Sequence, residues 1–328
     1  MKDAIRDIEG MKDSPQDVIL RVDNVAKEYK LRVNGARRTI RAVDDVSFTC
    51  GPGETIGLVG ESGSGKTTLG RMVAGLISPT LGNVITVPRS EMSASAVQMV
   101  YQNPAESLDP RWRIETSVGE PLISVKGDAR RAAVAEALDA VGLSPDLAQR
   151  RPHELSGGQQ QRACIARAVI GDPSVIVLDE AVSGLDVVLQ RDVLALLRKL
   201  QSRTGTSYLF ISHDLTVVAA ISSRILVMYL GRVVEAVPLA ELGGPFLHPY
   251  SVVLHSAQLK PTAEGGRPAP MVITGEPPSG MDKTVGCRFA PRCPLADDQC
   301  RREEPPLTDR GNGRLVACYH SGELSDAS

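Results

Sequence analysis

Short apolar runs alternate with longer amphipathic stretches along most of this chain. A continuous apolar run is typical of a strand buried on both faces of a parallel sheet, whereas apolar residues at i, i+3, i+4 and i+7 indicate one face of a helix. The repeated order of strand, helix and strand therefore predicts an α/β fold. The expected strands of this kind are residues 55–59, 97–103 (ending on a polar residue before Pro104), 175–180 and 207–212, followed by a strand pair at 225–228 and 233–234 around Gly231.

Two stretches follow a different pattern. Residues 18–43 alternate between polar and apolar positions on both sides of Asn34-Gly35, which is a strong signal for a β-hairpin. A further strand is expected at residues 82–87. Between about 105 and 170 the pattern is helical, and an alanine-rich helix at 132–141 stops at Gly142, a residue suited to the position just past a helix.

The overall composition is that of a globular protein. The chain has 328 residues, and its 42% hydrophobic content allows a sizeable core. Its 37 Lys and Arg residues nearly balance its 39 Asp and Glu residues, so charge gives no reason to expect nucleic acid as a partner. No apolar run approaches the roughly 18 residues of a membrane span, and residues 1–17 are polar and predict a loose tail without a signal-peptide core. We therefore expect a cytosolic protein, in which any membrane role would have to come through partners.

One stretch carries a specific nucleotide-binding motif, G-x-x-x-x-G-K-[ST]. It follows an expected strand and precedes a helix whose apolar residues recur at i, i+3, i+4 and i+7 from Leu69 to Leu76, which is the context that the motif requires. The glycines let backbone N–H groups turn toward phosphate oxygens, and the helix N-terminus adds its positive dipole end. Lys66 would contact the β- and γ-phosphates, and the Thr67 hydroxyl would bind Mg²⁺. The loop consists of Gly60, Glu61, Ser62, Gly63, Ser64, Gly65, Lys66, Thr67 and Thr68.

Acidic and histidine side chains follow two of the expected strands. Asp179 and Glu180 end one strand, and His213 comes just after another. The carboxyl ends of parallel strands form the edge at which open α/β sheets bind ligands. Asp179 there can hold Mg²⁺ through water, and Glu180 can polarise an attacking water molecule. His213 is a candidate for a γ-phosphate contact, and the alternative is a structural histidine.

A second pair of glycines opens a predicted helix. Ser156 and Gln159 stand in the S-x-x-Q relation of a capping box, which predicts a helix over residues 160–170. Gly157 and Gly158 are poor helix formers, each costing roughly 1 kcal/mol relative to alanine. Their presence makes sense if a ligand must contact that backbone, and the alternative is an ordinary capped helix.

Together, these motifs resemble those of the nucleotide-binding subunit of an ABC transporter over about residues 18–258. The resemblance implies a P-loop NTPase of the ABC type, with a RecA-like core, an antiparallel β subdomain and an α-helical subdomain at about 105–170, which binds ATP and Mg²⁺. On this resemblance, Tyr29 stacks on adenine, residues 60–68 are the Walker A loop, and Gln102 contacts Mg²⁺ and the attacking water. Residues 155–159 are the signature motif, and Asp179 and Glu180 are the Walker B pair. Asp186 belongs to the D-loop and His213 to the H-loop.

Domains of this family work as head-to-tail pairs, so the resemblance implies an active site shared with a second subunit. Ser156 would then contact the γ-phosphate bound by the partner, and ATP binding and hydrolysis would close and open the pair. This chain departs from the family pattern at Ala181, where proline is usual, and at Gly184, where alanine is commoner. Neither departure removes a catalytic group.

A finer likeness is to the oligopeptide/dipeptide (and nickel) importer group. It rests on Tyr101-Gln102-Asn103-Pro104, on residues 107–111, on His248-Pro249-Tyr250 and on the tail at 286–296. Residues 180–187 and 210–215 look most like the F-type subunit of that group, which pairs with a D-type subunit. The implied partners are that D-type subunit, two transmembrane permease subunits and, indirectly, an extracytoplasmic substrate-binding protein, at the cytoplasmic face of the inner membrane.

Four of the six cysteines lie in a small C-terminal extension expected at residues 259–328. Their C-x5-C-x6-C-x17-C spacing is atypical for zinc sites, which favour closely spaced pairs. Four thiolates can equally hold a [4Fe–4S] cluster, and the related importer extensions are implied to carry one. Zinc, and reduced thiols or disulfides, stay open as alternatives. The candidate ligands are Cys287, Cys293, Cys300 and Cys318.

Basic residues lie beside these cysteines in the sequence. Such cationic neighbours are expected to offset the charge of a cluster and to lower the pKa values of the thiols. The two remaining cysteines, Cys50 and Cys164, are expected to be buried apolar residues. The flanking basic residues are Arg288, Arg292, Arg301 and Arg302.

Three functions compete on this basis. The chain would be the ATP-hydrolysing subunit of a peptide importer, the equivalent subunit of a nickel or metal-chelate importer, or a non-transport ABC protein acting on DNA or ribosomes. The third class usually has two nucleotide domains in one chain or a coiled-coil insertion, and this sequence has one nucleotide domain and no heptad run. We choose the peptide importer, because that branch is the larger one.

Overall fold

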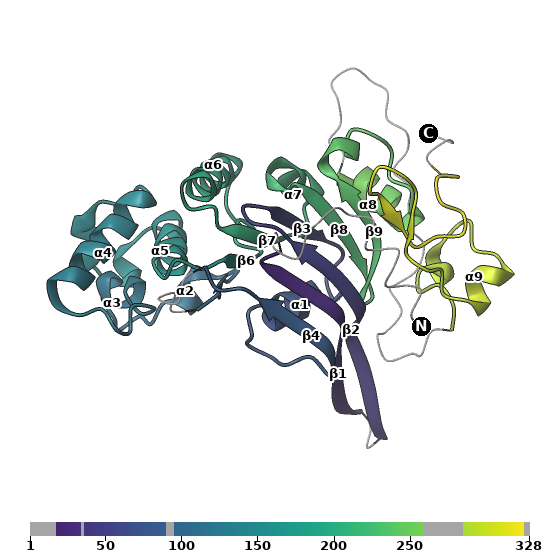
Figure 1. The fold of residues 1–328 in the computed structure, drawn as a ribbon, viewed down its shortest axis with the longest axis horizontal. Coiled ribbons are helices and arrows are strands. Elements are labelled where there is room, and N and C mark those ends of the chain that lie inside the picture. The colour runs from purple at the N-terminus through teal and green to yellow at the C-terminus, as the bar shows by residue number, and fades with distance from the viewer. Residues whose placement is uncertain (1–17, 34–35, 90–94, 259–284, 325–328) are drawn as a thin grey trace.

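The computed structural model describes residues 18–33, 36–89, 95–258 and 285–324 (Figure 1). The predicted turn at Asn34-Gly35, the predicted tail at 1–17 and residues 259–284 of the expected extension lie outside the described residues. No helix in the described part of the chain is both long and apolar enough to cross a membrane.

A mixed sheet of eight strands forms the centre of the protein, in the order β10-β11-β9-β8-β3-β7-β6-β5. The five strands from β5 to β8 in this order run parallel, and β9 returns antiparallel to β8. The α/β fold and the strands predicted from apolar runs are therefore confirmed. The strands are β3 (Thr55–Val59), β5 (Val97–Val100), β6 (Val175–Asp179), β7 (Ser207–Ile211), β8 (Arg224–Tyr229), β9 (Arg232–Pro238), β10 (Thr308–Asp309) and β11 (Leu315–Val316).

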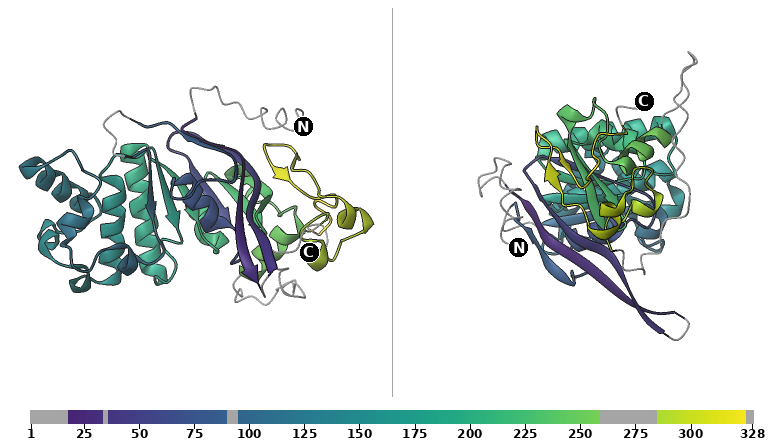
Figure 2. Two further views of the ribbon diagram at one scale, coloured as in Figure 1. Left: turned by 90° about the horizontal axis from the view of Figure 1, so that it is seen from below. Right: turned by 90° about the vertical axis from the view of Figure 1, so that its right-hand side faces the viewer.

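A second, antiparallel sheet contains three strands in the order β2-β1-β4. β1 (Leu20–Val33) and β2 (Ala36–Cys50) pair up to Val33 and Ala36, so the predicted hairpin is confirmed on both sides of its turn. β4 (Leu81–Thr86) is the strand expected at 82–87 and pairs with the start of β1. Figure 2 shows the far end of this hairpin projecting beyond the rest of the molecule.

Two hydrophobic cores lie on the two faces of the central sheet, because successive side chains of a strand point to opposite faces. Ile176 and Leu178 of β6 belong to the core shared with α5, α6 and α7, whereas Val175 and Val177 belong to the core shared with α1 and the β1–β2 hairpin. The helices of these two layers are α1 (Lys66–Val73), α5 (Gly157–Val169), α6 (Val187–Thr204) and α7 (Leu215–Ile221).

The predicted helix bounds need three corrections. α1 ends at Val73, because the chain turns at Gly75 with φ +71°, and Leu76 is 53% exposed beyond the helix rather than on its buried face. The alanine-rich helix α4 begins earlier than the alanine run, at Gly127, and α5 begins at Gly157 rather than at residue 160. With α2 (Pro104–Ser107), α3 (Ile114–Val118) and α4 (Gly127–Ala140), the helices expected between about 105 and 170 are present at one end of the molecule (Figure 1).

The described part of the C-terminal extension continues the central sheet. β11 pairs antiparallel with β9, so the extension adds two short strands to the sheet edge, at the end opposite α3 and α4 (Figure 1). A buried ion pair holds the joint, because Arg314 lies 2.7 Å from Glu235 of β9, a fully buried carboxylate. The remaining elements here are α8 (Pro249–Gln258), the short 3₁₀ turn Ala290–Arg292 and α9 (Asp298–Arg302).

Candidate active site

The phosphate loop joins the end of β3 to the start of α1. At two of its glycines, no residue with a side chain would fit. Gly60 has φ +156° and Gly65 has φ +103°. A Cβ atom at either position would lie 2.1 Å from a backbone oxygen, that of Met228 or of Ala42. The backbone therefore packs too closely for any side chain, and glycine at both positions lets the loop turn from β3 into the N-terminus of α1, the end of a helix that favours a phosphate.

Lys66 is the buried cation of this loop. Its Nζ donates hydrogen bonds to the backbone oxygens of Gly60 at 2.8 Å and Glu61 at 2.9 Å, and the residue is only 6% exposed. Burial lowers the pKa of Lys66, although Glu180, Asp179 and Glu61 act in the opposite direction. Among the described residues no carboxylate forms an ion pair with this ammonium group, and a phosphate group would supply such a partner.

Asp179 and Thr67 form the candidate Mg²⁺ site. The Thr67 hydroxyl donates to Asp179 Oδ1 at 3.1 Å, so the two predicted ligands lie side by side. Burial raises the pKa of Asp179, and Glu180 adds to the rise while the Thr67 hydrogen bond opposes it. A divalent cation would reverse this shift, and oxygen donors of this kind are those that Mg²⁺ prefers, so the residues present fit the ion.

Glu180 and His213 meet at the ends of β6 and β7. These strands pair through Asp179 and Ile211, and His213 Nδ1 lies 3.5 Å from Glu180 Oε2. Glu180 has a backbone φ of +49°, which is uncommon for a residue with a side chain. Hydrogen bonds from its N–H to the Ile211 oxygen and from the Ser183 hydroxyl to its own oxygen hold this conformation. The geometry suits a fixed carboxylate acting on a water molecule.

Gln102 and Tyr29 lie apart from this cluster. Gln102 is exposed two residues beyond the end of β5, the strand beside β6, and it makes no hydrogen bond to Asp179 among the described residues. Tyr29 lies on β1 and is 37% exposed, with Lys27 Nζ 5.6 Å from the centre of its ring. Both predicted roles, water and Mg²⁺ contact for Gln102 and adenine stacking for Tyr29, stay predictions.

The signature motif forms a separate groove. The predicted capping box is confirmed, since Ser156 N–H donates to Gln159 Oε1 at 2.9 Å and Gln159 N–H donates to Ser156 Oγ at 3.3 Å. Asp186 caps α6 through the N–H groups of Val188 and Leu189. The groove is lined by Ser156, Gly157, Gly158, Gln159, Arg162, Gly184, Leu185, Asp186 and Leu189, and none of these belongs to the phosphate loop.

Two residues that contact the phosphate loop were missed as site residues. The N–H of Glu61 donates to the Tyr250 hydroxyl at 2.8 Å, and Arg292 of the extension lies 3.0 Å from the Glu61 carboxylate. Tyr250 belongs to the His248-Pro249-Tyr250 motif, which was noted only as a family likeness. Arg292 was noted only as a neighbour of Cys293, because its contact spans more than two hundred positions along the chain.

Comparisons with known proteins identify this arrangement. The family description "ABC transporter" matches residues 43–183, and "Oligopeptide/dipeptide transporter, C-terminal region" matches residues 234–300. A putative peptide import ATP-binding protein of Brucella abortus (strain 2308) is 46% identical over 320 residues, which cover 93% of this chain and 94% of that protein. The chain belongs to the ABC transporter family of ATP-binding subunits.

Other members of the family carry the same likeness. The oligopeptide transport ATP-binding protein OppF of Haemophilus influenzae is 39% identical over 322 residues, which cover 92% of this chain and 97% of that protein. The dipeptide transport ATP-binding protein DppF of the same organism is 41% identical over 295 residues, with 86% and 89% coverage. A solved dimeric ATP-binding cassette, in a post-hydrolysis state bound to ADP and Pi, has a TM-score of 0.59 at 30% identity and covers 67% of this chain and 99% of its own. The ABC-type ATPase fold is therefore established for this ABC subunit.

The four cysteines of the extension line one mainly apolar pocket. Burial raises the pKa of Cys293 to about 11 and that of Cys318 to about 12, and the neighbouring thiols add to both shifts. Burial also raises the pKa values of Cys287 and Cys300. These groups are therefore neutral thiols by themselves, and a bound metal would have to displace their protons.

The expectation that flanking arginines lower these pKa values is wrong. The guanidinium groups are engaged with other partners, so they do not offset the burial of the thiols. Cys50 and Cys164 are buried, as predicted, and burial raises the pKa of Cys164 to about 11. Arg288 contacts Asp44 and Glu304, Arg292 contacts Glu61, Arg301 contacts Asp298, and Arg302 donates to the Asp298 backbone oxygen.

Proposed function

We propose that this chain is the ATP-hydrolysing subunit of a peptide importer, acting in a head-to-tail pair with a homologous D-type subunit. In this proposal Glu180 acts on the attacking water, with His213 and Gln102 beside it, and Asp179 and Thr67 hold Mg²⁺. Tyr29 stacks on the adenine. The pair drives two transmembrane permease subunits from the cytoplasmic face of the inner membrane, and an extracytoplasmic binding protein delivers the substrate.

The observation that carries the paired arrangement is the separation of two half-sites. The groove of Ser156 and Asp186 shares no residue with the phosphate loop, although both features lie at a helix N-terminus, the end that favours an anion. Two such chains placed head to tail would complete both sites. The solved cassette that resembles this chain is dimeric and was bound to ADP and Pi, which supports the same arrangement.

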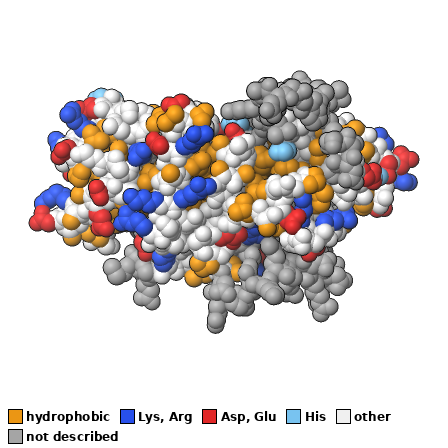
Figure 3. Space-filling model, turned by 90° about the horizontal axis from the view of Figure 1, so that it is seen from above, with side chains coloured by type: hydrophobic (Ala, Val, Ile, Leu, Met, Phe, Trp, Pro, Cys, Tyr) orange, Lys and Arg blue, Asp and Glu red, His pale blue; other side chains and the backbone are white. Residues whose placement is uncertain are grey.

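The peptide substrate is supported by the relatives, whose names include peptide import, dipeptide transport and oligopeptide transport. On the face seen in Figure 3, basic and acidic side chains are interspersed, with hydrophobic ones between them. This agrees with the near-balanced charge of the sequence.

Deletion of this chain from its host tests the substrate. Uptake of labelled di- and oligopeptides should fail, uptake of ⁶³Ni²⁺ should continue, and the intact chain supplied in trans should restore transport. A Lys66→Ala variant should not restore it, which ties the defect to ATP. Loss of nickel uptake with normal peptide uptake would contradict the peptide proposal and favour the metal importer.

We further propose a [4Fe–4S] cluster in the cysteine pocket. Among the described residues, the ligand atoms that gather within 4.8 Å of one another are those of Asp297, Cys300 and His320, and no three of the four cysteine sulfurs meet that limit. A single tetrahedral zinc ion with Zn–S bonds of about 2.3 Å would hold its four sulfurs about 3.8 Å apart. The wider arrangement of the thiols around one pocket favours a multi-iron cluster, which would cross-link four points of this loop-rich segment.

Anaerobic purification followed by iron and sulfide assays tests the cluster. We expect about four of each per chain. Cys318→Ser should lose iron, whereas Cys164→Ala should keep it, because Cys164 lies in the helical layer. A colourless, iron-free protein loaded with zinc would contradict the cluster.

A further inference from the structure

The C-terminal extension reaches back to the second residue of the phosphate loop. Arg292 makes a two-pronged contact with the Glu61 carboxylate, with Nη1–Oε2 at 3.0 Å and Nη2–Oε1 at 3.3 Å. The Arg292 side chain is 8% exposed and that of Glu61 is 30% exposed. A paired guanidinium–carboxylate contact of this kind fixes orientation as well as distance.

Glu61 is also held through its backbone. Its N–H donates to the Tyr250 hydroxyl at 2.8 Å, and its oxygen accepts from Lys66 Nζ at 2.9 Å. Arg292 Nη1 donates in turn to the Tyr229 hydroxyl at 3.2 Å, and the Tyr229 and Tyr250 rings lie 4.6 Å apart. The side chain of this loop residue is therefore held by Arg292 of the extension, and its backbone is held by Tyr250 of α8 and by Lys66.

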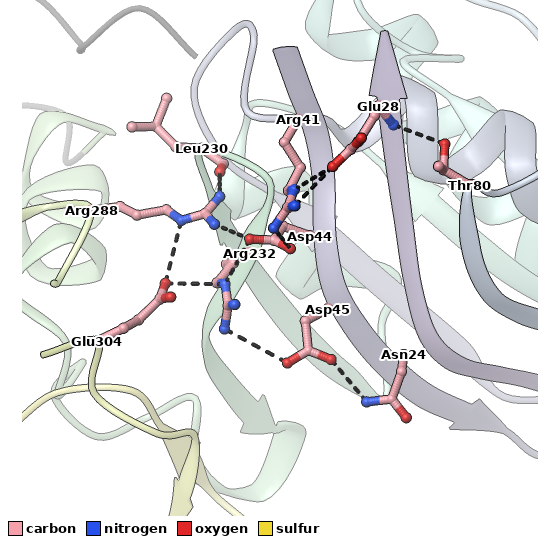
Figure 4. A network of polar contacts seen from close by, with 10 residues as sticks. All are labelled: Asn24, Glu28, Arg41, Asp44, Asp45, Thr80, Leu230, Arg232, Arg288 and Glu304. Atoms are coloured by element: carbon pink, nitrogen blue, oxygen red, sulfur yellow. Dashed lines mark hydrogen bonds and ion pairs between the residues drawn. The ribbon is translucent and has the colours of Figure 1, made fainter. Parts of the chain in front are cut away.

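A second arginine of the extension is linked to the same loop indirectly, through residues that contact the loop. Arg288 contacts the Asp44 carboxylate and the Leu230 backbone oxygen, as Figure 4 shows. The next residue, Gly231, donates its N–H to the Ser64 oxygen at 2.8 Å and accepts from Asp44 N–H at 2.9 Å. Contacts from the extension thus lead to both Glu61 and Ser64.

The cysteine pocket adjoins these arginines. Arg292 ends the 3₁₀ turn Ala290–Arg292, which lies between Cys287 and Cys293. Phe289, one residue before the turn, lines the pocket and packs on Tyr229 at 5.3 Å and Tyr250 at 5.6 Å between ring centres. The position of Arg292 is therefore set by the fold of the extension.

We propose that Arg292 is a positioning residue for ATP binding, through which the C-terminal extension holds the phosphate loop in its binding shape. A loop that is already ordered loses less conformational freedom when it binds a ligand, so the contact raises affinity without touching the nucleotide. Release of about one loop residue would weaken ATP binding by about tenfold. The proposal rests on the phosphate loop binding ATP, and it depends neither on the transported substrate nor on what fills the cysteine pocket.

The test is a double-mutant cycle on the full-length chain, with affinity measured by titration of a fluorescent ATP analogue. Arg292→Gln and Glu61→Gln should each weaken binding about tenfold, and the double variant should be no weaker than either one, because both remove the same contact. Arg292→Lys keeps the charge but cannot form the paired contact with the Glu61 carboxylate, so its ATP affinity should lie between that of the parent and that of Arg292→Gln. Arg301→Gln is the matched control, since Arg301 is exposed on α9, and it should bind as the parent does.

Hydrogen exchange in the nucleotide-free chain distinguishes a local release of the phosphate loop from a general loss of stability. Arg292→Gln should speed exchange at residues 61–65 and leave the amides of β6 and β7 protected. Affinity equal to that of the parent in Arg292→Gln, or effects that add in the double variant, would overturn the proposal. Faster exchange spread over the whole sheet would also overturn the proposal.

Iron and zinc contents are measured in the same preparations, to exclude an effect through lost metal. A binding defect found only in metal-depleted preparations would also overturn the proposal. Failed peptide uptake or an iron-free pocket would leave this result unchanged.

Discussion

At the scale of single residues, the backbone conformation of Glu180 and the position of its carboxylate both agree with the predicted role toward the attacking water. Its φ of +49° is held by hydrogen bonds to its N–H and its oxygen, and His213 lies 3.5 Å from its carboxylate. Sparsely populated backbone conformations persist where the surrounding structure maintains them, and they concentrate at functional sites. The carboxylate is thus presented at one fixed place, beside the buried Asp179.

Glu180→Gln should therefore stop hydrolysis while leaving ATP binding intact. Loss of a general base lowers turnover by about 10²- to 10⁴-fold, whereas Gln keeps the size of the side chain and the phosphate contacts of Lys66 survive. ATP-bound pairs with the partner subunit should accumulate and be seen by size-exclusion chromatography. The control is Glu136→Gln, an exposed change on α4. Unaltered turnover in Glu180→Gln would refute the assignment.

At the scale of elements, a charged network joins the extension to the sheets. Asp44 of β2 lies between Arg41, Arg232 and Arg288, and Arg232 and Arg288 also share Glu304 of the extension (Figure 4). Burial by itself would raise the pKa of Asp44, but the charges of Arg288, Arg232 and Arg41 outweigh it and lower the pKa below its usual range. The extension is therefore docked by a carboxylate that stays ionised.

This network predicts an acid-sensitive joint. Because the folded pKa of Asp44 lies below its unfolded value, its stabilisation is fully present above about pH 5 and is lost as the pH falls through the folded pKa. Asp44→Asn should lower the free energy of unfolding by about 3 kcal/mol at pH 7, and the difference from the parent should shrink below pH 4. Asp23→Asn, which removes a surface pair with Arg21, should cost less than about 1 kcal/mol. A pH-independent difference for Asp44→Asn would contradict this account.

At the scale of the whole molecule, the two half-sites belong to different parts of the fold. The phosphate loop lies at the end of β3 in the central sheet, and the signature groove lies at the start of α5 and α6. The helical end and the extension occupy opposite ends of the molecule (Figure 1). In the proposed head-to-tail pair a complete site includes both subunits, so the chain by itself is expected to hydrolyse ATP slowly.

Ser156→Ala tests this arrangement in the reconstituted pair. The variant should bind ATP at its own phosphate loop as the parent does, yet hydrolysis at the partner's loop should fall by about tenfold or more, the loss of one hydrogen bond to a charged group. Because Ser156 also caps α5, a stability loss of about 1 kcal/mol is expected. Ser144→Ala removes another N-cap in the same helical part and is the matched control. Equal activity of the two variants would contradict a role in the shared site.

The sequence by itself determined the local parts of this protein. The apolar runs predicted β3 and the strands from β5 to β9, the phosphate-loop motif fell between β3 and α1, and Ser156 with Gln159 formed the predicted capping box. Such features depend on periodicity and on contacts within a few residues, so they are readable from the chain alone. The family likeness followed from the same short motifs.

Only the tertiary structure decided which distant residues meet. The flanking arginines were expected to serve the cysteine thiols, but folding turns Arg292 to Glu61 and Arg288 to Asp44, and the extension adds strands to β9. No local pattern predicts these contacts, because each depends on the packing of segments far apart in the chain. The sequence therefore identified the nucleotide loop, and the fold revealed that the C-terminal extension is tied to it.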